Sequence, residues 1–181
     1  LSYQEQKSST QAIWLYLISV GFIFLCLAAL YESWSIPTVV IAAIPLGVGG
    51  NIIFSYLAGF PNDIYFQIAL LTTIGLSCKN AILIVEFAAV AQQRGISAIA
   101  AAMEGAGLRL RPILMTSFAF VAGLIPLMWT VGPSAQGNHS ISFSAAGGML
   151  FGVFTGIFFI PLLFSIFQHL DETLKAKFKN D

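Results

Sequence analysis

The stretch GLSCKNAILIVEFA, residues 75–88, is the key to the fold: it belongs to a long apolar segment, and it places a lysine, Lys79, in the middle of that segment. The segment runs from Tyr65 to Ala91 and has the length and composition of a membrane-crossing helix. Lys79 would lie roughly 18–21 Å from either end of this helix, beyond the reach of about 6 Å that its side chain has. A charge at that depth costs about 2.5–3.5 kcal/mol on insertion scales. The lysine must therefore face a polar cavity, meet a carboxylate or give up its proton.

The composition of the chain is that of a membrane protein. Of its 181 residues, 57% are hydrophobic and only 9% are charged, and the mean hydropathy is +0.86. Soluble domains carry roughly 25% charged residues. The net charge is zero, which argues against nucleic acid as a partner. The two cysteines, Cys26 and Cys78, lie in apolar segments without metal-ligand spacing and are predicted to be free, buried thiols.

Sparse charges divide the chain into five apolar spans, each with the roughly 20 residues that cross a hydrocarbon core. The spans are apolar all round, whereas helices on the surface of a soluble protein show a polar face. We therefore predict an all-α integral membrane bundle of five transmembrane helices over residues 13–169, with spans at about 13–31, 37–58, 65–91, 111–131 and 145–169.

Lysine and arginine in the loops predict the orientation, because they accumulate on the cytoplasmic side of a membrane. One side carries six of them and the opposite side only Lys7; the six are Arg94, Arg109, Arg111, Lys175, Lys177 and Lys179. The tail at 170–181 is thus predicted to be cytoplasmic and the tail at 1–12 periplasmic. Residues 96–108 are apolar except on the side of Glu104 and predict an interfacial helix on the cytoplasmic surface.

No carboxylate of the sequence lies at the depth of Lys79. Glu86 shares nearly the same helix face but lies about 10 Å further along the axis, and the other acids fall at span ends or in loops. We therefore expect the counter-charge to come from elsewhere in a longer protein, of which a chain that starts at Leu1 would be a fragment. Proton uptake by such acids would release the lysine and bias a two-state element. A permanent ion pair that only holds helix register remains an alternative.

Three blocks occur in a defined order and spacing: FLCLAALYESWSIP (24–37), NDIYFQIALLTTIGLSCKNAILIVEFA (62–88) and LRLRPILMTSFAF (108–120). They resemble the resistance–nodulation–division (RND) multidrug exporters of the AcrB and MexB type, and the resemblance extends from Leu1 to about His169. It implies the C-terminal five helices of a twelve-helix transporter in the bacterial inner membrane.

The resemblance also implies a function and a set of site residues. Members of the family are homotrimeric drug/proton antiporters that export hydrophobic and amphiphilic compounds with a periplasmic adaptor protein and an outer-membrane channel. They are secondary active transporters rather than enzymes, need no cofactor and use the proton as coupling ion. Their proton relay joins aspartates of the N-terminal half to a lysine, an arginine and a threonine, which fall on Lys79, Arg109 and Thr116.

Other interpretations stay open at this level. From the residues alone, Arg109 is equally an anchor at the membrane surface, and the Thr116 hydroxyl equally a bond within its own helix. The chain could be a structural transmembrane module, or an exporter of another cargo such as a metal ion or a lipid. Hydrolase and phosphate-binding motifs are absent from the sequence, and its two histidines are isolated, which disfavours an enzyme or a metal site.

Overall fold

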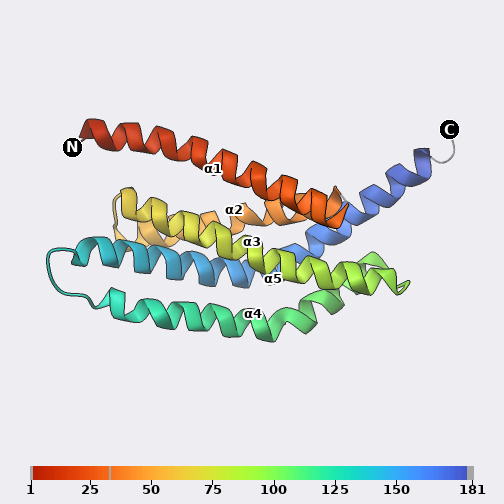
Figure 1. Ribbon diagram of the computed structural model, residues 1–181. Helices are drawn as coiled ribbons and strands as arrows, with labels where there is room; N and C mark the ends of the chain where they lie inside the picture. The colour runs from red at the N-terminus through yellow and green to blue at the C-terminus, as the bar shows by residue number, and fades with distance from the viewer. Residues whose placement is uncertain (1, 33, 179–181) are drawn as a thin grey trace.

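The computed structural model describes residues 2–32 and 34–178, and this part of the chain is helical apart from short connections (Figure 1). All five helices are long and apolar enough to cross a membrane, which confirms the prediction of an all-α bundle with five spans. The helices are α1 (Ser2–Tyr31), α2 (Ser35–Ala58), α3 (Ile64–Gln93), α4 (Ala98–Met128) and α5 (Ala135–Phe178).

Two connections lie at each end of the bundle, and we name the ends after the glycines found there. The Gly59 end carries the α2–α3 and α4–α5 connections, and the Gly95 end carries the α1–α2 and α3–α4 connections (Figure 1). Both glycines have positive φ angles, +71° and +86°, which favour glycine over residues with a Cβ. Asp63 caps α3, because its carboxylate accepts a hydrogen bond of 2.9 Å from the backbone N–H of Phe66.

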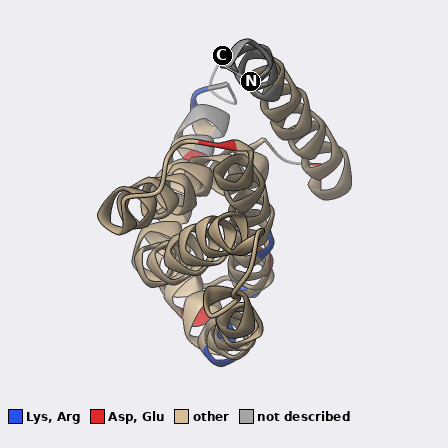
Figure 2. Ribbon diagram, turned by 90° about the vertical axis from the view of Figure 1, so that its left-hand side faces the viewer, with Lys and Arg blue, Asp and Glu red and all other residues tan. Residues whose placement is uncertain are grey.

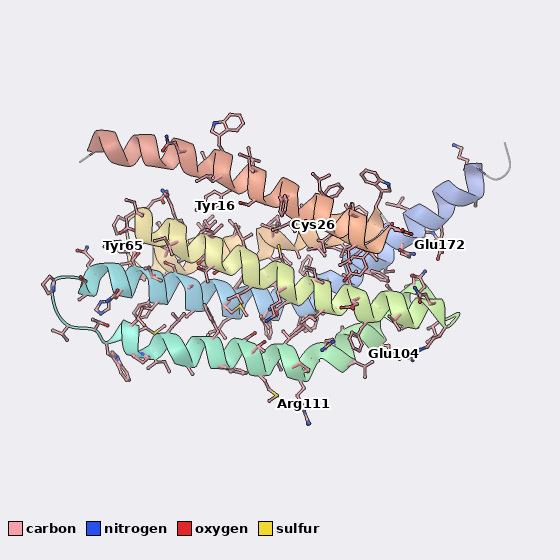
Figure 3. The ribbon with its side chains drawn as sticks, viewed as in Figure 1. Tyr16, Cys26, Tyr65, Glu104, Arg111 and Glu172 are labelled. Carbon is pink, nitrogen blue, oxygen red and sulfur yellow. The ribbon has the colours of Figure 1, made fainter. Side chains whose placement is uncertain are left out.

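Helix α4 begins at Ala98 and continues without a break to Met128. The separate interfacial helix predicted for residues 96–108 is therefore largely the first part of α4. Figures 1 and 3 show the helix bending near Arg111. The next residue, Pro112, lacks an N–H and its ring crowds the carbonyl four residues back, so it kinks the helix without ending it.

Helix α5 also begins earlier than the predicted span, at Ala135 instead of about residue 145. The polar residues in between are helical because their side chains find acceptors within the same helix. The Ser142 hydroxyl, for example, is buried and donates to the carbonyl of Asn138 at 2.7 Å. At its other end α5 continues through residues 170–178, which sequence analysis had assigned to the tail.

Helix α5 is the centre of the bundle and packs against α2, α3 and α4. It approaches α2 through Gly148 and Gly152, whose four-residue spacing places them on one face of the helix and lets the two backbones come close. A Cβ on Gly152 would lie only 3.2 Å from the Cα of Gly47, and one on Gly50 only 3.1 Å from the Cα of Gly148. These contacts leave no room for larger side chains at the α2–α5 interface.

Helix α1 lies to one side of the other four helices (Figure 2) and, among the described residues, contacts only α2 and α3. Only 6% of the residues in the most apolar stretch of α1 are buried, against 50% of those in the corresponding stretch of α3. The hydroxyl of Tyr16 ties it to α3 by donating to the carbonyl of Gln67 at 2.9 Å (Figure 3). Both cysteines are free, and Cys78 is buried as predicted, but Cys26 is exposed because α1 leaves most of its surface uncovered.

No Lys, Arg, Asp or Glu residue is fully buried within the described bundle, and its buried polar residues are all serine, threonine or asparagine. Figure 2 marks the positions of the charged residues along the ribbon. Lys79 is no exception to this rule, because it lies on the outside of α3.

Candidate functional site: Lys79, Arg109 and Thr116

Lys79 lies on an exposed stripe of α3. The stripe follows one face of the helix, with exposed residues three, four or seven positions apart; it comprises Ile68, Thr72, Gly75, Lys79, Glu86 and Val90. The residues on either side of the lysine, Cys78 and Asn80, are buried against the rest of the bundle. Lys79 therefore points away from the helices of this chain, at mid-span.

No hydrogen bond or ion pair joins Lys79 to another residue within the described part of the chain, whose one recorded ion pair is Arg94–Glu104. Glu86 shares the exposed stripe but is two helical turns away, about 10 Å along the axis. As sequence analysis predicted, the lysine has no carboxylate at its own depth in these helices.

Arg109 is half-buried on α4, next to α3. Its guanidinium carbon lies 3.9 Å from the centre of the Phe87 ring, a cation–π contact between the two helices. Its Nε is buried and has no hydrogen-bond partner among the described residues. The side chain of Arg111 is exposed and points away from the bundle (Figure 3), in the position expected of a surface anchor. Arg109 is thus held against α3 by an aromatic ring and keeps donors free.

Thr116 is exposed on α4, two turns after Arg109. Its hydroxyl donates to the carbonyl of Ile113 at 3.0 Å, the local bond that the sequence suggested. The hydroxyl of Ser117 donates to the same carbonyl at 2.6 Å but is buried on the opposite side. The oxygen of Thr116 remains able to accept a hydrogen bond from outside the bundle.

The contacts between α3 and α4 set the relative depth of these residues. Ile113 borders the same small cavity as Ser77 and Asn80, and the two helices run antiparallel. Thr116 therefore lies within about one turn, or roughly 5 Å, of the level of Lys79. Arg109 lies closer to the Gly95 end than Thr116 does, by roughly 10 Å along α4. The structure brings Lys79 and Thr116 to similar depth on uncovered faces of neighbouring helices, but it records no contact among the three.

Two features of the site escaped sequence analysis. Phe87, the ring under Arg109, carries no signal beyond being one of the 16 phenylalanines of the chain. Sequence analysis also missed the buried polar side chains Asn51 and Thr73. The only signal for them was a four-residue spacing, of Asn51 from Gly47 and of Thr73 from Ser77.

Within the described residues there is no group of three or more His, Cys, Asp or Glu side chains that could hold a metal ion.

Five helices that are long and apolar enough to cross a membrane, with a lysine at mid-span, define a polytopic membrane protein. The sequence model of the AcrB/AcrD/AcrF family matches residues 1–168, so the chain belongs to this family, and the resemblance to RND exporters is confirmed.

Individual relatives are close over nearly the whole chain. It is 51% identical over 176 residues to the multidrug resistance protein MdtF of Escherichia coli, a match that covers 97% of this chain and 17% of MdtF. It is 50% identical over 164 residues to the toluene efflux pump membrane transporter TtgB of Pseudomonas putida, covering 91% of this chain and 16% of TtgB. The chain thus spans about a sixth of the length of the curated relatives it matches.

Proposed function

We propose that this chain is the proton-coupling half of a secondary active multidrug exporter, a drug/proton antiporter of the bacterial inner membrane. The observation that carries the proposal is the position of Lys79: at mid-span, on an uncovered face, with no anionic partner among the described residues. A lysine in that place is costly against lipid. It is favourable against carboxylates of a second group of helices packed on the same face.

The exposed stripe of α3 is suited to such a partner. It contains Glu86 as well as the lysine, and a purely lipid-facing stripe would not contain two ionisable groups. We assign the missing surface to the N-terminal half of the same transporter, which would supply the acidic relay residues. Membership in the AcrB/AcrD/AcrF family supports this assignment.

The proposed mechanism uses the difference between two protonation states. When the acids are ionised, the ammonium group of Lys79 pairs with them and holds α3 against the other half. When the acids take up protons, the attraction is lost and the lysine is released toward another acceptor, for which the Thr116 oxygen lies at similar depth. Arg109, held on α3 by Phe87, keeps its charge on the side of the Gly95 end. Proton binding thereby shifts α3 between two states, one paired with the other half of the transporter and one released from it. Such a shift is what coupling to transport requires.

The orientation, the cargo and the partners of the exporter follow from the same proposal. We assign the Gly95 end to the cytoplasm, because Arg94, Arg109 and Arg111 gather there. The cargo would be hydrophobic and amphiphilic compounds, since relatives are named a multidrug resistance protein and a toluene efflux pump. The functional unit would be a homotrimer that works with a periplasmic adaptor protein and an outer-membrane channel.

The test is proton-driven dye efflux by the full-length protein carrying Lys79→Met, compared at equal membrane abundance with Leu71→Met. Both positions are exposed on α3 and both variants receive the same side chain, but only the first loses a charge. We expect Lys79→Met to lose efflux while Leu71→Met retains it. Normal efflux by an abundant Lys79→Met protein would refute the relay and leave a lysine that only holds helix register.

A further inference from the structure

The junction of α2, α3 and α5 contains uncharged polar side chains that are buried deep in an otherwise apolar interior. Each of the three helices contributes at least one of them. Five of their atoms have no hydrogen-bond partner among the described residues, namely Asn51 Oδ1, Thr73 Oγ1, Asn80 Nδ2, Ser140 Oγ and Ser144 Oγ. The five side chains are between 0% and 6% exposed.

The middle of this group is contiguous, because the side chains pack on the glycines where the helices meet. Asn51 lies against Gly148, where a Cβ on the glycine would come within 2.6 Å of its amide carbon. One turn earlier on the same face of α2, Ser77 Oγ occupies the space beside Gly47, and a Cβ on that glycine would also lie 3.2 Å from Cγ2 of Thr73. Polar groups of α2 and α3 therefore meet along the α5 glycines.

The group extends along the bundle in both directions from these glycines. On α5, Ser144 precedes Gly148 by one turn and Ser140 precedes it by two, which leads toward the Gly59 end. On α3, Asn80 follows Ser77 by one turn in the opposite direction. The buried polar atoms thus follow a line from the Gly59 end to the middle of the bundle.

A small cavity lies at the inner end of the line. Ser77, Asn80 and Gly152 line it together with apolar residues of α2, α4 and α5. About 10 Å³ is open to the centre of a water-sized sphere, which is about the room that one water molecule needs. The Nδ2 of Asn80 borders this space without a partner in the described residues.

Buried polar groups in native proteins are nearly always hydrogen-bonded, and bound water satisfies those that the protein does not. We propose that the α2–α3–α5 junction binds a short file of water molecules that starts near Ser140 and ends at Asn80. Gly50 and Gly147 pack against phenylalanine rings and form a dry part of the interface, whereas Gly47, Gly148 and Gly152 each face a polar group along the proposed file. Because Asn80 follows Lys79 directly, the file would bring water to the depth of the lysine, on the buried side of α3. The proposal concerns water binding alone and stands independently of the proposed transport function.

Electron cryomicroscopy of the full-length protein in lipid nanodiscs tests the proposal, at a resolution that shows ordered water elsewhere in the same map. We expect a water peak within hydrogen-bonding distance of Asn80 Nδ2, roughly 2.7–3.2 Å, and further peaks near Thr73 and Ser144. A map without these peaks, or one in which the Asn80 amide bonds to a protein group, would overturn the proposal.

A variant pair provides the control. Asn80→Leu keeps a similar volume but removes the polar atoms, so the peak at this position is expected to disappear. Thr72→Val alters an exposed hydroxyl that donates to the carbonyl of Ile68 at 2.9 Å, and should leave every peak of the file in place. Persistence of the Asn80 peak in the leucine variant would show that the amide does not bind it. The wild-type map decides the question even if a variant does not fold.

Discussion

The close approach of α3 and α4 predicts a large difference between two otherwise similar glycine substitutions. Gly105 is buried on α4 at the point where that helix touches the backbone of α3. A Cβ at this position would lie 2.7 Å from the backbone nitrogen of Ala88 and 2.9 Å from the carbonyl oxygen of Ile84. Gly107, two residues further along the same helix, is exposed and has nothing within 4 Å of the same position. Gly105→Ala should therefore destabilise the protein and Gly107→Ala should not.

The magnitude follows from the atoms that would have to move. Ordinary contacts of a Cβ begin at about 3.4 Å, so α3 and α4 would have to separate by about 0.5–0.7 Å. Both obstructing atoms belong to the α3 backbone and cannot rotate away. Overpacking of this kind costs about 1–3 kcal/mol. Alanine gains about 1 kcal/mol over glycine in a helix interior, a gain common to both variants. The free energies of unfolding of the two variants should thus differ by about 1–3 kcal/mol.

The assay is reversible unfolding of the full-length protein in mixed detergent micelles, with the two variants and the wild type measured side by side. Gly107→Ala should match or exceed the wild type, and Gly105→Ala should fall below Gly107→Ala by the stated amount. Equal stability of the two variants would refute the packing argument, because it would mean that α3 and α4 are not in backbone contact at this point.

Three further predictions concern contacts of the same helices. Phe87→Leu and Arg109→Leu should each weaken the α3–α4 interface by about 0.5–2 kcal/mol, and a double-mutant cycle should show coupling between them; independent effects would exclude the cation–π contact. Arg94→Ala should change the free energy of unfolding by less than about 1 kcal/mol. The ion pair between Arg94 and Glu104 is long, at 3.8 Å, and the two side chains are 66% and 38% exposed. A larger loss of unfolding free energy would contradict the prediction that this pair contributes little. Thr116→Val should reduce proton-driven dye efflux at unchanged abundance and Thr116→Ser should restore it, whereas wild-type efflux by the valine variant would remove Thr116 from the relay.

The number and approximate positions of the spans could be predicted from the sequence because they depend on local composition. A run of about 20 apolar residues has few alternatives to a membrane helix, whatever surrounds it. The depth of Lys79 followed in the same way, from its distance in residues to either end of its span. The helix bounds were less predictable: the fourth span was predicted to begin at about residue 111, whereas α4 begins at Ala98 and continues through Pro112 with a bend.

Family membership was also readable from the sequence, because three motif blocks carry it without any knowledge of the fold. The same blocks mark Lys79, Arg109 and Thr116 as the relay residues, and that assignment remains a prediction. The helical periodicity of α3 showed that Lys79 and Asn80 face different directions, but it could not say which of the two would be covered.

Only the tertiary structure decided which faces are buried. Asn80 lies in the core and Lys79 on the outside because α5 and α4 happen to cover one side of α3 and leave the other uncovered. The ring under Arg109 and the polar group at the α2–α3–α5 junction are likewise contacts between residues far apart in the chain. The physical reason is that crossing the membrane requires only local hydrophobicity, whereas the surroundings of a polar atom depend on what packs against it.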